Sequence, residues 1–217
     1  ALLLWKMPNT KLPLPVRVKK NQQLSKHDRR PALLYASLIA LVTFVSNGTS
    51  THLPEFIASV GLPVAVGMLW GIGQTGARFL EVVSGSALTP LRLTILTTSL
   101  MPLCFALGLS GAFLSWAAGG FVLGYGAING LTTVFKATLP LQLFAAEDYA
   151  RLTGILLIPA QLLAAISPFA YAWLNHHFGL RGSLAVSAVL AVMVAALAMA
   201  IAWCQQENTP AAIEERG

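Results

Sequence analysis

The chain has 217 residues, of which 56% are hydrophobic and only 10% are charged. A soluble domain has about 25% charged residues, so the composition excludes a water-soluble globule and a disordered chain and indicates a polytopic membrane protein. The formal net charge is +6, but the basic residues lie between apolar segments, which argues against nucleic-acid binding. Cys104 and Cys204 lie inside apolar runs and are interpreted as small buried hydrophobic residues.

The chain begins with a short apolar stretch, Ala1–Trp5, which reads as the end of a preceding helix and suggests a missing N-terminal part. The rest of 1–30 is basic and rich in proline, as expected for a cytoplasmic linker. Because a bilayer-spanning helix needs about 20 predominantly apolar residues, six spans are predicted in the region 31–204. Their approximate ranges are 31–54, 63–85, 90–109, 112–136, 153–174 and 182–204, before a polar cytoplasmic tail at 205–217.

The backbone cannot leave its polar groups unpaired in lipid, so these spans are predicted to be helices and the fold an all-α bundle of six transmembrane helices. Every Lys and Arg except Arg181 falls on the side of the bundle that holds both termini. The positive-inside rule therefore predicts a multi-pass protein of the cell membrane with both termini in the cytoplasm. The predicted outer connections at 53–62, 110–111 and 175–181 are short, so the function must lie within the bundle.

Glycine pairs four residues apart allow two helix backbones to approach closely. Such pairs occur at Gly67 and Gly71, at Gly120 and Gly124, and at Gly126 and Gly130. They predict either an interface that slides during a conformational change or static packing.

Polar side chains within the apolar spans favour an internal polar path, because such groups are costly in lipid unless they face the bundle interior or a wet cavity. For any single residue, a hydrogen bond between helices is the simpler interpretation. The predicted path residues are Asn47, Gln74, Asn129 and Gln161, and Pro159 adds a predicted kink.

His52 and Glu55 are three residues apart near the outer end of the first span, so on a helix they share one face. The pair is interpreted either as a proton relay or as an ion pair at the rim of the bundle.

An enzyme is the alternative class. Gly108-Leu109-Ser110-Gly111 matches a pattern of intramembrane serine proteases, and His176 or His177 could supply the base. Small residues are also what a tight turn between helices requires, so we expect no enzyme activity. The sequence has no metal-ligand spacing and no phosphate-binding loop, and no cofactor is expected.

Two stretches on the predicted cytoplasmic side resemble the corresponding parts of bacterial permeases of the major facilitator superfamily. They are Gly71–Glu81, and Gly130–Phe144 followed by Tyr149–Gly154. The similarity covers nearly the whole chain and matches the C-terminal six-helix half, with the basic linker as the central cytoplasmic loop. Arg78 matches the basic position of the family's loop pattern, although Ser84-Gly85-Ser86 stands where further charges occur in the family.

The resemblance implies one half of a secondary active transporter in the bacterial inner membrane, which moves a small solute by alternating access. It implies a second six-helix half as partner, a coupling proton, and two three-helix repeats of inverted topology. Arg78 and Glu81 are predicted to form an ion pair at the inner gate, and Lys136 to place a charge near the inner mouth of the path. A membrane subunit without transport activity is the remaining alternative.

Overall fold

The computed structural model describes residues 29–84, 88–111, 115–144 and 149–214. These residues form five α-helices and one short 3-10 helix, η2, and they contain no strand. The elements are α1 (Arg29–Ser59), η2 (Val64–Gly67), α2 (Met68–Val83), α3 (Pro90–Ser110), α4 (Ser115–Leu143) and α5 (Tyr149–Glu214). The prediction of an all-α fold is confirmed, whereas the predicted linker up to residue 28 lies outside the described residues.

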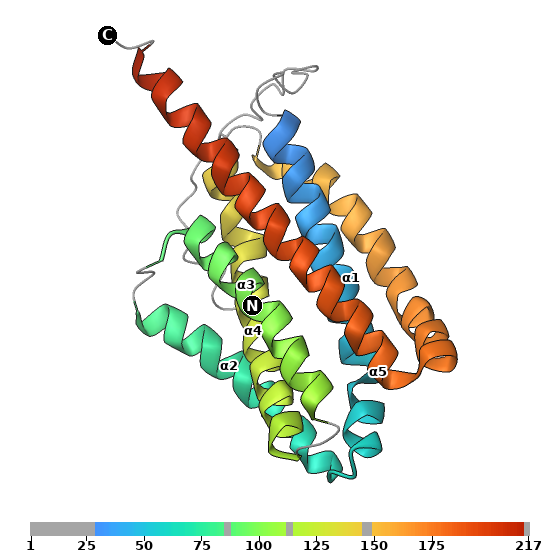
Figure 1. Cartoon of the computed structure of the whole chain (residues 1–217). Helices are drawn as coiled ribbons and strands as arrows, with labels where there is room; N and C mark the ends of the chain where they lie inside the picture. Colours follow the sequence, from blue (N-terminus) through green and yellow to red (C-terminus); the bar gives the residue numbers. More distant parts are fainter. Residues whose placement is uncertain (1–28, 85–87, 112–114, 145–148, 215–217) are drawn as a thin grey trace, which may run out of the picture.

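The predicted fifth and sixth spans both fall within α5, which consists of two helices joined at a kink. Within α5, Gly179 has φ of 67° and ψ of 173°, a region of backbone conformation that is essentially restricted to glycine. The chain reverses direction at this residue, so that the two parts of α5 run back along the bundle (Figure 1). The predicted loop at 175–181 was therefore wrong in extent, and α5 also continues as helix into the predicted polar tail.

The second predicted span, 63–85, is divided between η2 and α2. The helix α1 continues through Pro54 to Ser59 and ends in a glycine turn at Gly61, which has φ of 71°. There the Leu62 N–H donates to the Ile57 carbonyl at 3.2 Å, as in a Schellman motif. This turn reduces the second helix proper to the 16 residues of α2.

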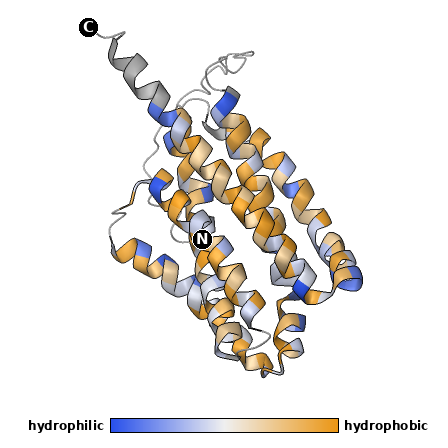
Figure 2. Ribbon diagram, viewed as in Figure 1, coloured by the Kyte–Doolittle hydropathy of each residue, from blue (hydrophilic) through white to orange (hydrophobic). Residues whose placement is uncertain are grey.

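Three stretches in the described part of the chain are long and apolar enough to cross a membrane, namely Arg30–Ser59, Pro90–Ser110 and Leu152–Gln206. The helix α4 has sufficient length at 29 residues, but Asn129, Lys136 and several glycines and threonines lower its hydropathy. Hydrophobic residues cover most of the helix surfaces and hydrophilic residues gather mainly near helix ends (Figure 2). These helices are compatible with a membrane protein.

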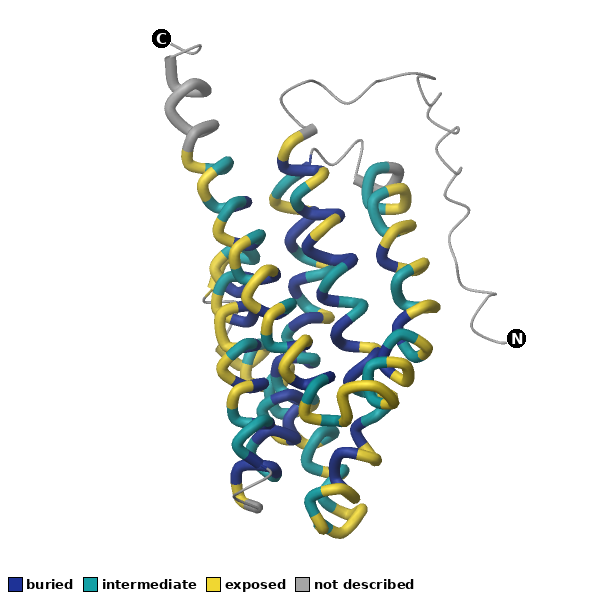
Figure 3. The backbone as a smooth tube through the Cα atoms, turned by 45° about the vertical axis from the view of Figure 1, so that its right-hand side comes forward, coloured by how far each residue is buried: buried dark blue, intermediate teal, exposed yellow. Residues whose placement is uncertain are grey.

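The helices pack with α1 against α5, α2 against α4, and α3 against both α4 and α5. Buried positions follow the inward faces of these helices, while exposed positions run along their outer faces (Figure 3). An aromatic cluster forms part of the core: the ring of Phe121 in α4 lies 5.1 Å from that of Phe56 in α1 and 5.8 Å from that of Phe105 in α3. This cluster fixes α4 between α1 and α3, and α2 is left at the edge of the bundle, beside α4.

Candidate functional site

A stripe of polar residues runs along α4. Asn129, Thr133 and Lys136 are spaced at i, i+4 and i+7, which places them on one side of the helix. The stripe lies between the positions that contact α1 and the glycines that contact α2. Thr133 is exposed, whereas Asn129 and Lys136 are half-buried. Two of the predicted path residues therefore share one side of α4.

Lys136 attaches this stripe to α1. Its Nζ donates a hydrogen bond to Thr43 Oγ1 at 2.8 Å, and the hydroxyl of Tyr35 donates to the Lys136 carbonyl at 3.1 Å. Among the described residues, no carboxylate oxygen lies within 4.0 Å of Lys136 Nζ. The ion pair in this part of the chain joins His52 to Glu55 instead. The ammonium group of Lys136 thus has a neutral partner, and Thr43 belongs to the site although the sequence analysis did not identify it.

Close backbone packing joins α4 to α2. A Cβ atom added to Gly126 would overlap the carbonyl of Trp70, and one added to Gly130 would overlap the carbonyl of Gln74. In the opposite direction, a Cβ on Gly73 would overlap the carbonyl of Leu123. The prediction of close approach is confirmed for Gly126 and Gly130.

The other two glycine pairs differ from this one. Gly71 has open space around it, and Gly67 faces only the side chain of Ile57. Gly120 and Gly124 face side chains of α3, with Leu107 Cδ2 and Cys104 Sγ at 3.2 and 3.4 Å from their added Cβ atoms. Close packing of two backbones at these glycine pairs is thus restricted to Gly126 and Gly130.

Arg78 and Glu81 do not pair with each other in this conformation. Arg78 Nε donates to the Gly130 carbonyl at 3.4 Å, which links α2 to α4 near the same close contact. Glu81 instead lines a groove of about 350 Å³ between α2, α3 and α4. The predicted gate ion pair is absent between these two described residues because Arg78 is directed to α4, and a gating role for them stays a prediction.

The remaining path residues lie on three different helices, α1, α2 and α5. Asn47 is exposed on α1, and its carbonyl accepts a hydrogen bond from the Thr51 hydroxyl at 2.8 Å. Gln161 is exposed on α5, and Gln74 is half-buried on α2. Asn47 lies on α1 and Gln74 on α2, the two helices that flank the polar stripe of α4. Gln161 lies on α5, which packs against α1.

Interhelical hydrogen bonds surround the middle of α1. The Tyr125 hydroxyl donates to the Ser46 carbonyl at 2.7 Å and accepts from the Ser50 hydroxyl at 3.2 Å. The Ser167 hydroxyl of α5 donates to the Phe44 carbonyl at 2.6 Å. These contacts use the expected means of joining helices in an apolar medium, and the tyrosine and serines within apolar runs were the sequence signal for them.

An apolar cavity of about 250 Å³ lies where α1 meets η2 and the start of α2. Its walls include Leu53, Ile57 and Val64, with Ser50 and Trp70 as the side chains that carry polar groups. The cavity lies next to the Ser50–Tyr125 hydrogen bond and therefore at the outer end of the α1–α4 contact.

His52 forms the other polar contact of α1. Its Nδ1 lies 3.0 Å from Glu55 Oε2, and its Nε2 lies 3.3 Å from the Pro168 carbonyl of α5. The His52 side chain is 14% exposed and that of Glu55 is 60% exposed. The predicted proximity of His52 and Glu55 is confirmed, and the contact of His52 with α5 is an addition from the structure.

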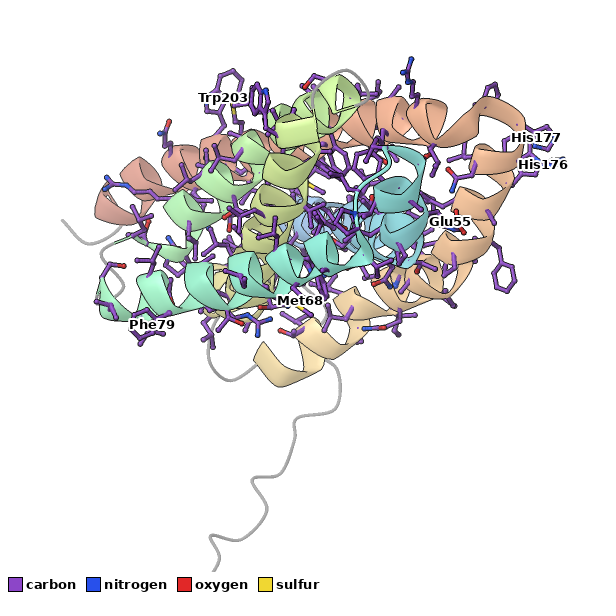
Figure 4. All side chains as sticks on the ribbon, turned by 90° about the horizontal axis from the view of Figure 1, so that it is seen from below. Glu55, Met68, Phe79, His176, His177 and Trp203 are labelled. Carbon is purple, nitrogen blue, oxygen red and sulfur yellow. The ribbon has the colours of Figure 1, made fainter. Side chains whose placement is uncertain are left out.

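The residues of the enzyme alternative form no catalytic arrangement in the described part of the chain. The Ser110 hydroxyl donates to the Leu107 carbonyl of its own helix at 2.8 Å. His177 Nδ1 donates to the Trp173 carbonyl at 2.9 Å, and no hydrogen bond joins Ser110 to a histidine there. His176 and His177 project away from the bundle at the kink of α5 (Figure 4).

The remaining surfaces of the bundle are almost entirely apolar. Between residues 185 and 203 of α5 every exposed residue is apolar, and the exposed residues of α3 between 93 and 109 include a single polar one, Ser99. Met68 and Phe79 are 72% and 66% exposed on the outer side of α2, and Trp203 lies on the opposite side of the molecule (Figure 4). Polar groups are therefore concentrated on the side formed by α1, α2 and α4.

Comparison with known proteins gave no match to a protein-family model, to a curated protein or to a solved structure.

Proposed function

We propose that this chain is one half of a secondary active transporter that moves a small solute through the membrane by alternating access. The observation that carries the proposal is the unequal distribution of polar groups over an otherwise apolar helical bundle. Polar residues are tolerated at membrane depth when they face protein or a water-filled cavity. The side formed by α1, α2 and α4 carries Asn47, Gln74, Asn129, Thr133 and Lys136, so it is the side that we assign to the solute path.

In this proposal the chain crosses the inner membrane six times. The two parts of α5 on either side of Gly179 count as separate crossings, since the stretch Leu152–Gln206 is 55 residues long and one crossing needs about 20. The second crossing consists of η2 and α2, and the fourth is the more polar helix α4. Both pack against other helices of the bundle. A second six-helix half covers the polar side and completes the path.

The charge of Lys136 defines the chemistry of the path. Its ammonium is half-buried, and its hydrogen-bond partner is the neutral Thr43 hydroxyl. Burial of a charge is costly unless a partner compensates for it. A solute with a carboxylate or another anionic group supplies that partner, and we therefore assign such solutes to this path ahead of cationic ones.

Cysteine accessibility tests whether the polar side is wet. In a background with Cys104→Ala and Cys204→Ser, single cysteines at Thr133 and Asn47 are compared with matched cysteines at Val189 and Leu100 on the apolar surfaces. A membrane-impermeant thiol reagent is expected to label the first pair in the folded protein in membranes and to leave the second pair unlabelled. Equal labelling of the two pairs would contradict a water-filled path on this side.

Transport itself is tested with the complete gene product in liposomes. We expect exchange of radiolabelled organic anions, in a panel that also holds neutral and cationic solutes, to exceed that of empty liposomes. Lys136→Met is expected to abolish the exchange, whereas Lys136→Arg retains part of it. A gene product that moves no member of the panel would leave the accessibility result to be explained by a non-transporting subunit.

A further inference from the structure

The groove between α2, α3 and α4 combines an apolar surface with one acidic side chain. Both α2 and α3 pack against α4, but in the described part of the chain they do not pack against each other. The groove between them has a volume of about 350 Å³. Its apolar wall residues are Ala77, Leu80, Leu88, Leu93, Leu96 and Leu131. Of these, Leu80, Leu88 and Leu96 are 68%, 42% and 45% exposed, so the helices leave much of this apolar surface uncovered.

Glu81 is the acidic residue of the groove, and it is half-buried. Among the described residues, its carboxylate forms no hydrogen bond or ion pair. Ser84, the other polar wall residue, donates its hydroxyl to the backbone carbonyls of Leu80 and Glu81 at 2.7 and 2.9 Å. The negative charge of Glu81 is therefore left without a partner next to the leucines.

The nearby basic residues do not supply this partner. On α2, Arg78 Nε donates to the Gly130 carbonyl at 3.4 Å. On α3, Arg92 is exposed in the first turn and forms no ion pair within 4.0 Å. On α4, Lys136 Nζ donates to Thr43 of α1. Each helix that forms the groove thus carries a basic side chain, and none of the three pairs with Glu81.

The direction of α2 adds to the negative potential at this point. Glu81 lies in the last turn of the helix, which ends at Val83 and has no basic residue there. The C-terminus of a helix carries a partial negative charge and favours a cation. The helix end and the carboxylate therefore attract a positive group to the same end of the groove.

We propose that this groove binds an amphipathic amine, with its ammonium at Glu81 and its apolar body against the leucines. A metal ion is a poor match, because hard cations such as calcium take several oxygen ligands and Glu81 is the one carboxylate in the wall. A purely apolar molecule would cover the leucines and leave the charge unpaired. An organic ammonium matches the charge and the apolar surface together.

The size of the groove indicates a small amine. An apolar cavity of about 150 Å³ binds benzene. A groove of about 350 Å³ therefore accepts a body of about ten to twelve carbon atoms. This is much smaller than a membrane phospholipid, so we assign the groove to a free amine. The site is separate from the proposed solute path, and the inference stands independently of transport.

Three nitroxides that share one apolar ring test the charge preference. They are 4-amino-TEMPO, 4-hydroxy-TEMPO and 4-carboxy-TEMPO, which carry a cationic, a neutral and an anionic group. The full chain in phosphatidylcholine nanodiscs carries a trifluoroethylthio label on Ser99→Cys, in the background with Cys104→Ala and Cys204→Ser. Ser99 is exposed on α3, three residues after Leu96 and on the same side of the helix. The readout is the relaxation of the ¹⁹F signal by the nitroxide.

We expect 4-amino-TEMPO to give a relaxation that saturates with concentration, on top of a linear background from nitroxide dissolved in the lipid. The neutral and anionic nitroxides are expected to give the linear background alone. The same label on Phe169→Cys is the control, because the first part of α5 lies at the opposite edge of the bundle from α2 (Figure 1). A linear response of the Ser99 label to all three nitroxides, or equal saturation by all three, would overturn the proposal.

Two pairs of variants test the assigned contacts. Glu81→Gln is expected to raise the half-saturating concentration of 4-amino-TEMPO about fivefold, the upper range for a partly exposed ion pair. Glu55→Gln removes a carboxylate of α1 outside the groove and is expected to leave that concentration unchanged. Ala77→Leu fills the groove and is expected to abolish saturation, whereas Ala77→Ser retains it. An unchanged half-saturating concentration in Glu81→Gln would contradict the role of Glu81.

Lipid composition distinguishes a free amine from a lipid headgroup. Replacement of part of the phosphatidylcholine by phosphatidylethanolamine is expected to leave the half-saturating concentration unchanged. A value that rises with the phosphatidylethanolamine content would show that a lipid ammonium occupies the groove, and the assignment to a free amine would be wrong. None of these measurements requires a transported solute, so a failure of the transport proposal is distinguishable from a failure of this one.

Discussion

The contact between α2 and α4 can be tested with two alanine substitutions on the same helix. A Cβ on Gly73 would overlap the Leu123 carbonyl and lie 2.9 Å from the Ala127 nitrogen, whereas a Cβ on Gly76 meets nothing within 4 Å. Both substitutions raise helix propensity, which in an exposed helix interior is worth about 1 kcal/mol. The difference in stability between Gly73→Ala and Gly76→Ala therefore isolates the packing of the two backbones.

The overlap at Gly73 involves backbone atoms, which cannot rotate away as the end of a flexible side chain can. Inserting a group into packed structure costs about 1–3 kcal/mol. We therefore expect Gly76→Ala to be as stable as the parent or more so by up to about 1 kcal/mol. Gly73→Ala is expected to lie about 1–3 kcal/mol below Gly76→Ala.

Reversible unfolding in mixed lipid and detergent micelles, followed by circular dichroism, measures both variants. Gly71→Ala provides a further control, since this glycine also has open space around it. If Gly73→Ala were as stable as Gly76→Ala, the two backbones would not be in contact, and the role assigned to Gly126 and Gly130 would be wrong as well.

Three further predictions use other contacts. Gly179→Ala is expected to lower stability by about 1–3 kcal/mol, because φ of 67° with ψ of 173° excludes a Cβ, and Gly154→Ala is the control in thermal unfolding. Tyr125→Phe is expected to cost about 1 kcal/mol in the same assay, since it removes the hydrogen bond to the Ser46 carbonyl. Lys136→Met is expected to unfold at the same or a higher temperature while anion exchange is lost, because an apolar side chain replaces a half-buried charge. A marked loss of stability in Lys136→Met would make this lysine structural.

Helix positions followed from the apolar runs in most of the chain. The predicted third span, 90–109, corresponds to α3 at Pro90–Ser110. Thr89 caps α3, since its side chain accepts from the Arg92 N–H at 3.4 Å, and Pro90 occupies the first turn, where its missing N–H costs nothing. Helix starts with such local signals are accessible to sequence reasoning, because the signal and the structure involve the same few residues.

Sequence reasoning did not locate the end of α1 at Ser59 or the kink of α5 at Gly179. Pro54 was interpreted as the end of the first span, but a proline removes only one backbone hydrogen bond and neighbouring helices can compensate for it. At 175–181, polar residues and a glycine indicated a loop, whereas one residue with a positive φ is enough to turn the chain. The choice between a loop and a kink depends on the packing of α5 against α1 and α3, which local composition does not encode.

The sequence predicted which polar residues belong to the candidate site, but it did not predict the groups to which they form hydrogen bonds. Lys136, Asn129 and Gln74 were identified because polar groups are rare within apolar runs. Their partners include Thr43 and the Gly130 carbonyl, an ordinary residue and a backbone atom with no sequence signal. The gate prediction failed to anticipate the orientation of Arg78 for the same reason, since its partner is the backbone carbonyl of Gly130 on another helix.

The two polar contacts of α1 lie on one continuous helix, and this gives them a physical connection. Thr43 and His52 are nine residues apart, which corresponds to about 14 Å along a helix. Between them, the Phe44 and Ser46 carbonyls accept hydrogen bonds from Ser167 of α5 and Tyr125 of α4. Because these contacts lie on one continuous helix, a displacement of α1 in the proposed transport cycle would carry the Thr43 contact of Lys136 together with the contacts to α4 and α5.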